Sequence, residues 1–339
     1  MSVPVMPFRV GIIGAGSIAQ RAHIPAWQSI PNVQVVAICA QEIELAQLVA
    51  KTSGIAHVFL DHRELLKLDL DAVSICVPNA LHFSIAMEAL QSGKHVLCEK
   101  PLALTAAEVK TLGEKSEELG LTLMTQHQLR FAGPALAARA WVDAGKLGSV
   151  YHAQVKALRR TQIPTSPGFI DKTLSGGGPA LDIGVHPLDI ALWLMGFPRP
   201  IRVTGSTRRN FDHGQDFSVE DFASAFVHFE NGATMTIESS WSGHYAEPTG
   251  LSCGLFGKEG SLYWPSGDFY PNEIHDSMQS IPTVPFAEKP HFEAIRSFYE
   301  SIRDSRPSPI PWRETYWVIA IIEALYRSAE EKREITIPE

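Results

Sequence analysis

The chain has 339 residues, of which 45% are hydrophobic and 19% charged, and its formal net charge is −8 at pH 7. This length allows two domains of ordinary size, and the composition is typical of a soluble globular enzyme. The negative charge and the lack of any Lys/Arg cluster argue against a nucleic-acid-binding surface, which would need a basic patch.

The four cysteines form no CxxC pair, and three of them lie near the ends of apolar runs, which indicates buried thiols in a reducing compartment. No apolar stretch is long enough to span a membrane, and the N-terminal segment lacks the basic region of a signal peptide. We therefore expect a cytoplasmic protein that binds neither membranes nor nucleic acid.

The first predicted element is a strand at residues 9–13, which leads through a glycine turn into a helix at residues 20–30. This order of elements begins a dinucleotide-binding fold. Gly14 permits the tight turn, Gly16 lets the backbone approach a pyrophosphate, and Ala19 lets the helix lie close to the strand. The N–H groups at the helix start face the anion. The predicted cofactor-binding residues here are Gly14, Gly16, Ser17, Ile18 and Ala19.

Strands and helices then alternate up to residue 124. Further strands are predicted at residues 33–39, 58–60, 72–77, 95–98 and 121–124. Helices are predicted between them at residues 42–52, 62–68, 81–91 and 105–119. The alternation predicts a parallel, doubly wound Rossmann sheet, and six strands are the size of a complete dinucleotide domain. We place this domain at residues 1–125.

The position that would bind the adenosine ribose follows the second strand. An acid there would accept a hydrogen bond from the 2′-hydroxyl of NAD, whereas an Arg would suit the phosphate of NADP. This chain has Ala40 and Gln41 at the position, and both are predicted cofactor contacts. Glu42 lies two residues after Ala40, at a position where an acid suits the first turn of the next helix. Both NAD and NADP are therefore possible cofactors.

Polar residues follow the fourth and fifth strands, at the sheet edge that lines the ligand crevice of an open α/β fold. Glu99 and Lys100 precede Pro101, and this lysine differs from one on a solvated helix face. The alternative is a surface turn with an incidental charge pair. Asn79 and His82 are expected to open onto the same crevice. For His82 the alternative is a first-turn helix residue without a ligand contact.

After residue 124 the chain has consecutive strands, predicted at residues 149–158, 201–208, 219–229, 233–241 and 251–256. Asn231-Gly232 between two of them is a strong hairpin signal, so the sheet should be mainly antiparallel. We place an α+β substrate-binding and oligomerisation domain at residues 126–339, closed by helices at 292–303 and 313–332. A large open sheet covered by helices on one face leaves the other for another subunit, which predicts a homodimer or homotetramer.

Asp182, His186 and Asp189 lie at positions i, i+4 and i+7 and would share one face of a helix. Because Pro187 would disturb a helix interior, we expect a helical turn, a break near His186 and a longer helix from Pro187. The set fits an acid–base pair, a metal site or structural hydrogen bonding. A third metal-ligand motif is lacking, so we predict no metal, and Asp189 is expected to be structural.

The chain resembles the Gfo/Idh/MocA oxidoreductases, a family named for glucose-fructose oxidoreductase and inositol dehydrogenase. The resemblance rests on Gly14-Ala-Gly-Ser-Ile-Ala19, Val77-Pro-Asn-Ala-Leu-His82, Glu99-Lys-Pro101 and Gly176-Gly-Gly-Pro-Ala-Leu-Asp-Ile-Gly-Val-His-Pro-Leu-Asp189. The joint occurrence of these motifs at the family's spacing is highly specific. Ala40 departs from the family pattern, since NAD-using members commonly carry an acid there.

The resemblance implies an NAD(P)-dependent enzyme that transfers hydride between nicotinamide and a sugar, polyol or sugar-like cyclic alcohol. It implies that His186 takes the proton of the reacting hydroxyl, Lys100 stabilises the developing alkoxide, and Asp182 orients the substrate or the histidine. These three catalytic residues are expected to meet across the domain crevice. Candidate substrate contacts are Arg130, Arg159, Arg160 and Asp171. Arg159 and Arg160 also fit surface or subunit contacts.

Two other functions fit the same scaffold. An enzyme of this kind can keep NAD bound and use transient oxidation, for example in glycoside cleavage, which would give turnover without net NADH. A non-catalytic sensor of NAD(P) and sugar would be expected to lose the Lys, Asp and His set, and here all three residues are present.

Overall fold

The computed structural model describes residues 6–160, 163–211, 217–243, 245, 249–272, 278–281 and 289–338. The chain forms two compact units. The first contains Met1–Ala103, Ala107–Gln128 and Lys289–Arg313, and the second contains Leu104–Ala106, Leu129–Glu288 and Glu314–Glu339. The segment Lys289–Arg313 thus packs with the N-terminal unit, although the predicted border at residue 125 assigned it to the second domain.

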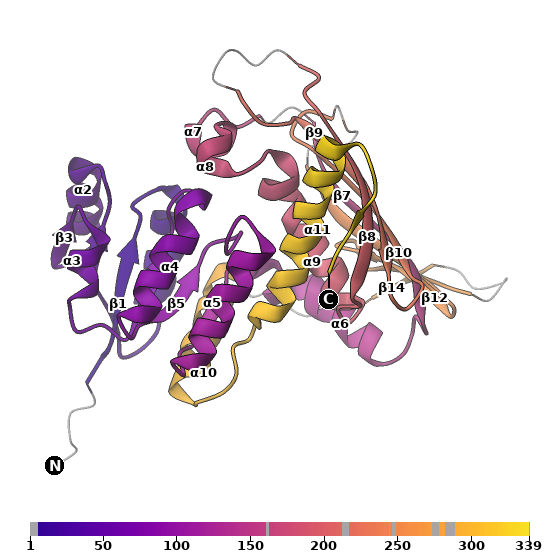
Figure 1. Ribbon diagram of the computed structural model, residues 1–339. Helices are drawn as coiled ribbons and strands as arrows, with labels where there is room; N and C mark the ends of the chain where they lie inside the picture. The colour runs from indigo at the N-terminus through magenta and orange to yellow at the C-terminus, as the bar shows by residue number, and fades with distance from the viewer. Residues whose placement is uncertain are drawn as a thin grey trace. The chain divides into compact units, whose positions relative to one another are not determined.

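The first unit is a parallel sheet with the order β3-β2-β1-β4-β5-β6 (Figure 1). Its strands are β1 (Phe8–Ile13), β2 (Val33–Cys39), β3 (His57–Phe59), β4 (Ala72–Ile75), β5 (His95–Cys98) and β6 (Leu123–Thr125). Its helical segments are η1 (Ala19–His23), α1 (Ile24–Gln28), α2 (Ile43–Ser53), α3 (His62–Leu66), η2 (Asn79–Leu81), α4 (His82–Gln91), α5 (Ala106–Glu118) and α10 (Pro290–Arg303). The strand order reverses between β1 and β4, where open α/β sheets bind ligands. The predicted doubly wound sheet is confirmed.

Aromatic packing attaches α10 to the N-terminal unit. Trp27 of α1 is fully buried, and its ring lies 6.1 Å from Phe298 of α10 and 6.2 Å from Phe8 of β1. Truncating a buried aromatic side chain of this size costs about 3–5 kcal/mol. This contact explains why a segment far along the chain belongs to the first unit.

The second unit contains a sheet with the order β14-β13-β12-β11-β7-β10-β9-β8-β15, and among its described strands only β7 and β10 pair in parallel. Its main strands are β7 (Val150–Arg159), β8 (Pro200–Arg208), β9 (Phe222–Phe229), β10 (Thr234–Ser240), β11 (Thr249–Gly257), β12 (Gly260–Trp264) and β13 (Asp268–Pro271). The short strands are β14 (Gln279–Ser280) and β15 (Ile335–Thr336). Asn231 and Gly232 join β9 to β10 as a hairpin, as predicted.

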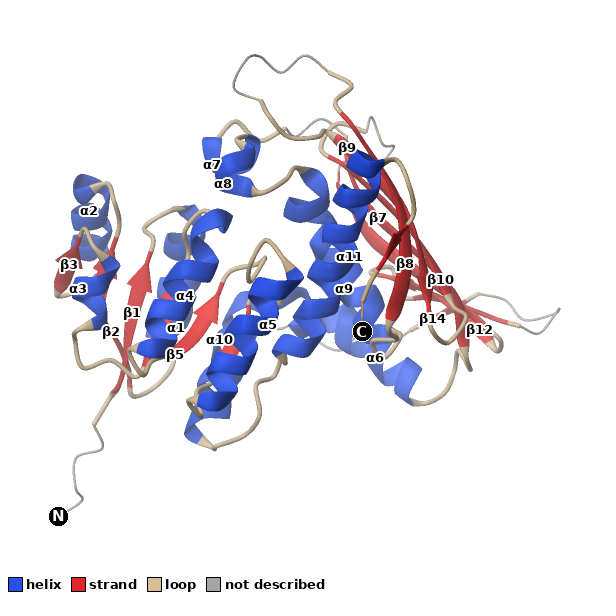
Figure 2. Cartoon of the chain, in the orientation of Figure 1, coloured by secondary structure: helices blue, strands red, loops and turns tan. Residues whose placement is uncertain are grey.

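Helices cover one face of this sheet (Figure 2). The helical segments of this unit are η3 (Gln128–Phe131), α6 (Gly133–Asp143), α7 (Pro167–Ile170), α8 (Lys172–Ser175), η4 (Ala180–Gly184), α9 (Val185–Leu194) and α11 (Trp312–Glu331), of which α7 and α8 pack mainly on each other. Among them α9 packs on β7 and β11, and α6 packs on β12. Across the described part of the chain, no helix is both long and apolar enough to cross a membrane. All four cysteines are free and buried, which was predicted for Cys39, Cys76 and Cys98.

The predicted break near His186 is wrong. The chain runs from η4, which is a π-helical turn, directly into α9, with Pro187 as the third residue of α9. A proline inside an ordinary helix clashes with the carbonyl four residues earlier, and its missing N–H leaves that carbonyl without a donor. The wider π turn, bonded from i to i+5, accommodates both effects without interrupting the helix.

Arg130 lies in a buried ion-pair network, which corrects its prediction as a substrate contact. The Arg130 side chain is only 5% exposed and donates two hydrogen bonds to Asp189, at 2.8 and 2.6 Å. It also bonds Glu314 of α11 and stacks on Trp193 and Phe197. Burial opposes its charge, but Asp189 and Glu314 outweigh this and raise the pKa of Arg130. The network joins η3, α9 and α11, and Asp189 is structural, as expected.

We expect Arg130→Met to lower the free energy of unfolding by about 3–5 kcal/mol, because the buried Asp189 carboxylate would lose its guanidinium. Denaturant titration followed by tryptophan fluorescence would measure this. Arg199→Met is the matched control, since it removes a two-bond Arg–Glu230 pair in which the Glu230 side chain is 62% exposed. Equal shifts of the denaturation midpoint in both variants would contradict the claim that the buried ion pair contributes more to stability than the exposed one.

Candidate active site

The turn after β1 has the geometry of a dinucleotide-binding loop. Gly14 has φ of +107°, and its N–H donates to the Cys39 carbonyl at 2.7 Å. A Cβ at Gly14 would lie 2.2 Å from the Cys76 carbonyl oxygen, so no other residue fits. At Gly16 a Cβ would meet no heavy atom of the described residues within 4 Å. The loop thus combines one glycine required for folding with one that leaves an open space.

The helix that follows this loop starts at residue 17, and its first amide groups lack intrahelical acceptors, which makes its N-terminus an anion site. Ser17 is exposed, Ile18 is half-buried, and Ala19 is fully buried against the sheet. An open space at Gly16, beside amide donors at the switch point of the sheet, fits the pyrophosphate of a dinucleotide. The residues of the predicted loop therefore suit this cofactor.

The ribose position lies after β2. The Ala40 N–H donates to the Phe59 carbonyl at 3.1 Å, and Ala40 is half-buried while Gln41 is exposed. Glu42 is exposed and occupies the N-cap position of α2, so the next helix explains this acid. Burial, with the Asp61 charge, raises the pKa of Cys39 to about 11, which keeps its thiol neutral. The structure therefore offers no acidic side chain inside the predicted slot itself.

His82 does not open onto the crevice, which corrects its prediction as a cofactor contact. Its ring is fully buried, with Nδ1 2.6 Å from the Pro101 carbonyl oxygen and Nε2 2.9 Å from that of Val77. Burial outweighs these bonds and lowers the pKa of His82. A neutral imidazole donates to one of the two carbonyls and lies against the other. Asn79, which begins η2, is half-buried.

Glu99, Lys100 and Pro101 follow β5 directly, and the Lys100–Pro101 peptide bond is cis. Lys100 is half-buried, whereas Glu99 is 8% exposed. Burial favours the neutral acid, but a hydrogen bond from His23 and the charges of His23, Lys100 and His291 together lower the pKa of Glu99. Glu99 is therefore ionised at neutral pH beside the predicted catalytic lysine.

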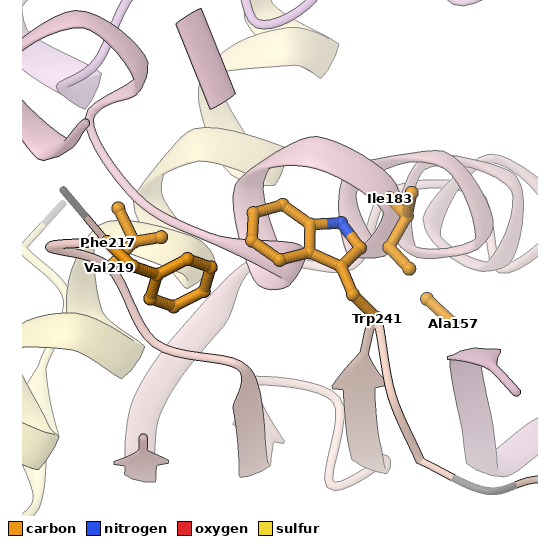
Figure 3. Packing of buried hydrophobic residues seen from close by; sticks show 5 residues of the cluster. All are labelled: Ala157, Ile183, Phe217, Val219 and Trp241. Atoms are coloured by element: carbon orange, nitrogen blue, oxygen red, sulfur yellow. The ribbon is translucent and has the colours of Figure 1, made fainter. Parts of the chain in front are cut away.

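In the second unit, η4 and α9 carry Asp182 and His186, both half-buried. The Trp241 indole N–H donates to Asp182 Oδ2 at 2.9 Å, which holds one carboxylate oxygen in place. The Trp241 ring is fully buried between Phe217 and Ile183, in a cluster with Ala157 and Val219 (Figure 3). Apolar packing thus fixes the donor that orients the acid. The sequence pattern did not identify Trp241, because this residue, directly after strand β10, is 59 positions from Asp182 in the sequence.

The glycines before η4 allow two side chains to hold the start of this helix. A Cβ at Gly177 would lie 2.2 Å from the Tyr326 hydroxyl, and one at Gly178 would lie 2.2 Å from the Glu220 carbonyl oxygen. The Glu220 carboxylate accepts from the Gly178 N–H at 2.9 Å and from the Tyr326 hydroxyl at 2.8 Å. Burial raises the pKa of Glu220, although these bonds oppose the rise. A carboxylate at a helix N-terminus is electrostatically favourable.

The remaining predicted substrate contacts lie on two segments of the second unit. Asp171 caps α8 by accepting from the Thr173 N–H and hydroxyl, both at 2.8 Å, so its carboxylate has a structural task. Arg159 is half-buried at the end of β7. Arg160 is exposed and donates to the Tyr245 carbonyl at 3.1 Å. Both arginines stay candidate substrate contacts.

Two family models match successive parts of the chain. Residues 8–127 match the family described as "Oxidoreductase family, NAD-binding Rossmann fold", and residues 135–263 match the "GFO/IDH/MocA C-terminal domain". The D-glucoside 3-dehydrogenase of Escherichia coli K12 is 30% identical over 337 residues, covering 96% of each chain. The scyllo-inositol 2-dehydrogenase (NADP(+)) of Bacillus subtilis is 25% identical over 345 residues, covering 97% of this chain and 96% of its own.

A solved levoglucosan dehydrogenase in complex with NADH has the same fold. It superimposes with a TM-score of 0.85 at 23% identity and covers 98% of this chain and 100% of its own. At this identity the likeness concerns the fold alone.

The two loop glycines generate a paired prediction. Gly14→Ala should destabilise the protein by about 2–4 kcal/mol, because the methyl group meets a backbone carbonyl at a positive φ. Gly16→Ala should leave the thermal midpoint nearly unchanged but weaken NAD binding about tenfold, because the methyl group occupies the space for the pyrophosphate. Thermal unfolding and calorimetric titration would measure both effects. Normal cofactor binding by Gly16→Ala would contradict the assigned site.

Proposed function

The chain belongs to the Gfo/Idh/MocA family of oxidoreductases, and from this premise we propose that it oxidises or reduces a sugar, polyol or similar cyclic alcohol with NAD or NADP. The observation that carries the proposal is the β1 loop, where Gly14 is required by the Cys76 carbonyl and Gly16 leaves open space at a helix N-terminus. The names of the relatives, a D-glucoside 3-dehydrogenase and an inositol dehydrogenase, support substrates with ring hydroxyls.

The catalytic roles belong to three residues in this proposal. The nicotinamide, when bound, supplies or accepts the hydride. His186 accepts the proton of the reacting hydroxyl, since an imidazole titrates near neutral pH. Lys100 places a positive charge at the oxygen that becomes an alkoxide. Asp182, with one oxygen held by the Trp241 indole, orients the substrate or the imidazole.

The D-glucoside relative guides the choice of substrates, so D-glucosides open the substrate panel, followed by inositols, aldopentoses and anhydrosugars. NAD and NADP are each titrated first, and reduction is then followed at the nicotinamide absorbance band. Turnover of a glycoside without net NADH, with nicotinamide co-purifying, would instead indicate transient oxidation. Binding of NAD and sugar without turnover of any panel member would indicate a sensor.

Lys100→Met and His186→Ala should each reduce kcat by about 10²–10⁴-fold, because each removes a charge or proton acceptor from the reacting oxygen. The dissociation constant of NAD should change little, since neither side chain binds the pyrophosphate in this proposal. Lys67→Met and His57→Ala are the matched controls, because both residues are exposed in the first unit. Full activity of Lys100→Met or His186→Ala would refute the role assigned to that residue.

We also propose that a second copy of this chain covers the open face of the sheet in the second unit, opposite α9. An aromatic row crosses this face: the rings of His152, Phe256, Tyr263 and Tyr270 follow one another at centroid distances of 5.8, 5.9 and 5.8 Å. A hollow of about 560 Å³ includes Tyr263 and Tyr270 in its lining. Phe226 of β9 is also 38% exposed, next to His228. Tyr270 is 44% exposed and the other rings of the row are half-buried, and a partly exposed aromatic surface of this extent favours an interface.

Phe226→Glu should shift the protein toward the monomer in sedimentation velocity, because a carboxylate would have to be buried at the proposed interface. Leu48→Glu is the control, since Leu48 is 59% exposed on α2 in the other unit. A wild-type chain that is monomeric at micromolar concentration would overturn the proposed interface.

A further inference from the structure

A connected set of polar side chains lies inside the otherwise apolar first unit. His23 ends η1, Ser74 lies within β4, and both are 0% exposed. Glu99, directly after β5, is 8% exposed. Buried polar and charged groups are costly unless their hydrogen bonds are made. Three such residues from distant segments therefore call for an explanation in terms of what they hold.

Hydrogen bonds join these residues to the backbone of Lys100. Ser74 Oγ lies 2.6 Å from His23 Nδ1, and His23 Nε2 lies 2.8 Å from Glu99 Oε1. The second oxygen of Glu99 accepts from the Lys100 N–H at 3.3 Å. Because an ionised carboxylate only accepts, His23 Nε2 donates to Glu99, and Nδ1 shares the other hydrogen bond with the Ser74 hydroxyl, which can donate or accept. Both ring nitrogens of His23 are therefore engaged in this relay.

The order Ser–His–Glu does not indicate a hydrolase. A nucleophilic serine must reach a substrate, whereas Ser74 is fully buried in a central strand. The relay ends instead at the turn of Glu99, Lys100 and Pro101. The same turn is held from its other end, where His82 Nδ1 lies 2.6 Å from the Pro101 carbonyl oxygen. Two buried histidines therefore fix the turn that carries Lys100.

We propose that Ser74, His23 and Glu99 form a positioning relay for Lys100, in which the buried histidine holds the Glu99 carboxylate beside the lysine. This inference rests on the catalytic role proposed for Lys100. The relay fixes the backbone of the lysine through its N–H and keeps a negative charge next to its ammonium group. His23 and Ser74 act through Glu99 and touch neither substrate nor cofactor, so they are positioning residues.

Electrostatics supports this reading. Burial alone would favour a neutral Glu99, yet the His23 hydrogen bond and the neighbouring positive charges lower the pKa of Glu99. His291 of α10 lies within this field, and its pKa is lowered by burial, against the attraction of Glu99. The titratable and charged groups that face Glu99 and its partners are Arg21 and His23 before α1, Cys76 after β4, His82 of α4, Cys98 of β5, Lys100 and His291.

The first test separates kcat from binding. His23→Leu should lower kcat about tenfold or more while changing the KM for substrate and the dissociation constant of NAD by less than about threefold, because only the lysine is misplaced. His23→Gln, which can still donate to Glu99 and accept from Ser74, should recover most of kcat. His62→Leu is the matched control. It breaks another His–Glu contact, in which His62 Nε2 lies 2.9 Å from Glu88 Oε2, and which is not part of the Lys100 turn.

The second test needs no turnover and covers the case in which His23→Leu does not fold. Lys100 is labelled with an amine-reactive reagent at pH 8. Peptide mass spectrometry measures the rate at which Lys100 is modified, with the modification rates of Lys67 and Lys110 as internal references. Glu99→Gln should raise the Lys100 rate about threefold or more, because loss of the carboxylate favours the reactive neutral amine. An unchanged rate, or normal kcat in a folded His23→Leu variant, would overturn the relay. Wild-type inactivity on the whole panel, with labelling as expected, would instead refute the proposed function.

Discussion

The first unit depends on the close approach of the β1 loop to the end of β4. Only a glycine fits at position 14, because a Cβ would lie 2.2 Å from the Cys76 carbonyl oxygen at φ +107°. This approach aligns the carboxyl ends of β1 and β4 at the point where the strand order reverses. The helix that follows then presents its amide groups over an open space at Gly16. Dinucleotide binding thus begins with one backbone contact.

Both units use a π turn before a proline to position polar residues. In the first unit η1 precedes Pro25 and ends in His23, which is bonded to Glu99. In the second unit η4 contains Asp182 and precedes Pro187. A π turn adds one residue to a helical turn and widens it. The helix therefore continues, while the side chains near the π turn point in a different direction than in a regular α-helix. The proline and the polar residue are therefore parts of the same local feature.

Much of the fold and part of the site could be predicted from local patterns. The strand–helix alternation, the Asn231-Gly232 hairpin and the loop glycines depend on neighbours in the sequence, and the structure has each of them. Arg130 and His82 could not be placed in this way. Each is polar and was predicted to line the crevice, but its buried partner lies elsewhere in the sequence. Arg130 bonds Asp189, 59 residues away, and His82 bonds the Pro101 carbonyl, 19 residues away.

The sequence by itself determined the fold class and the family, and it nominated Lys100, Asp182 and His186 as candidate catalytic residues, because these inferences follow from local periodicity and from motifs at fixed spacing. Only the tertiary structure decided which polar side chains contact these candidates or the segments that carry them. Trp241 with Asp182, Glu220 with Gly178, and His23 with Glu99 are pairs separated by 59, 42 and 76 residues. Such pairs have no signature in one sequence, since a hydrogen bond depends on distance in space and each residue alone resembles any other buried polar group.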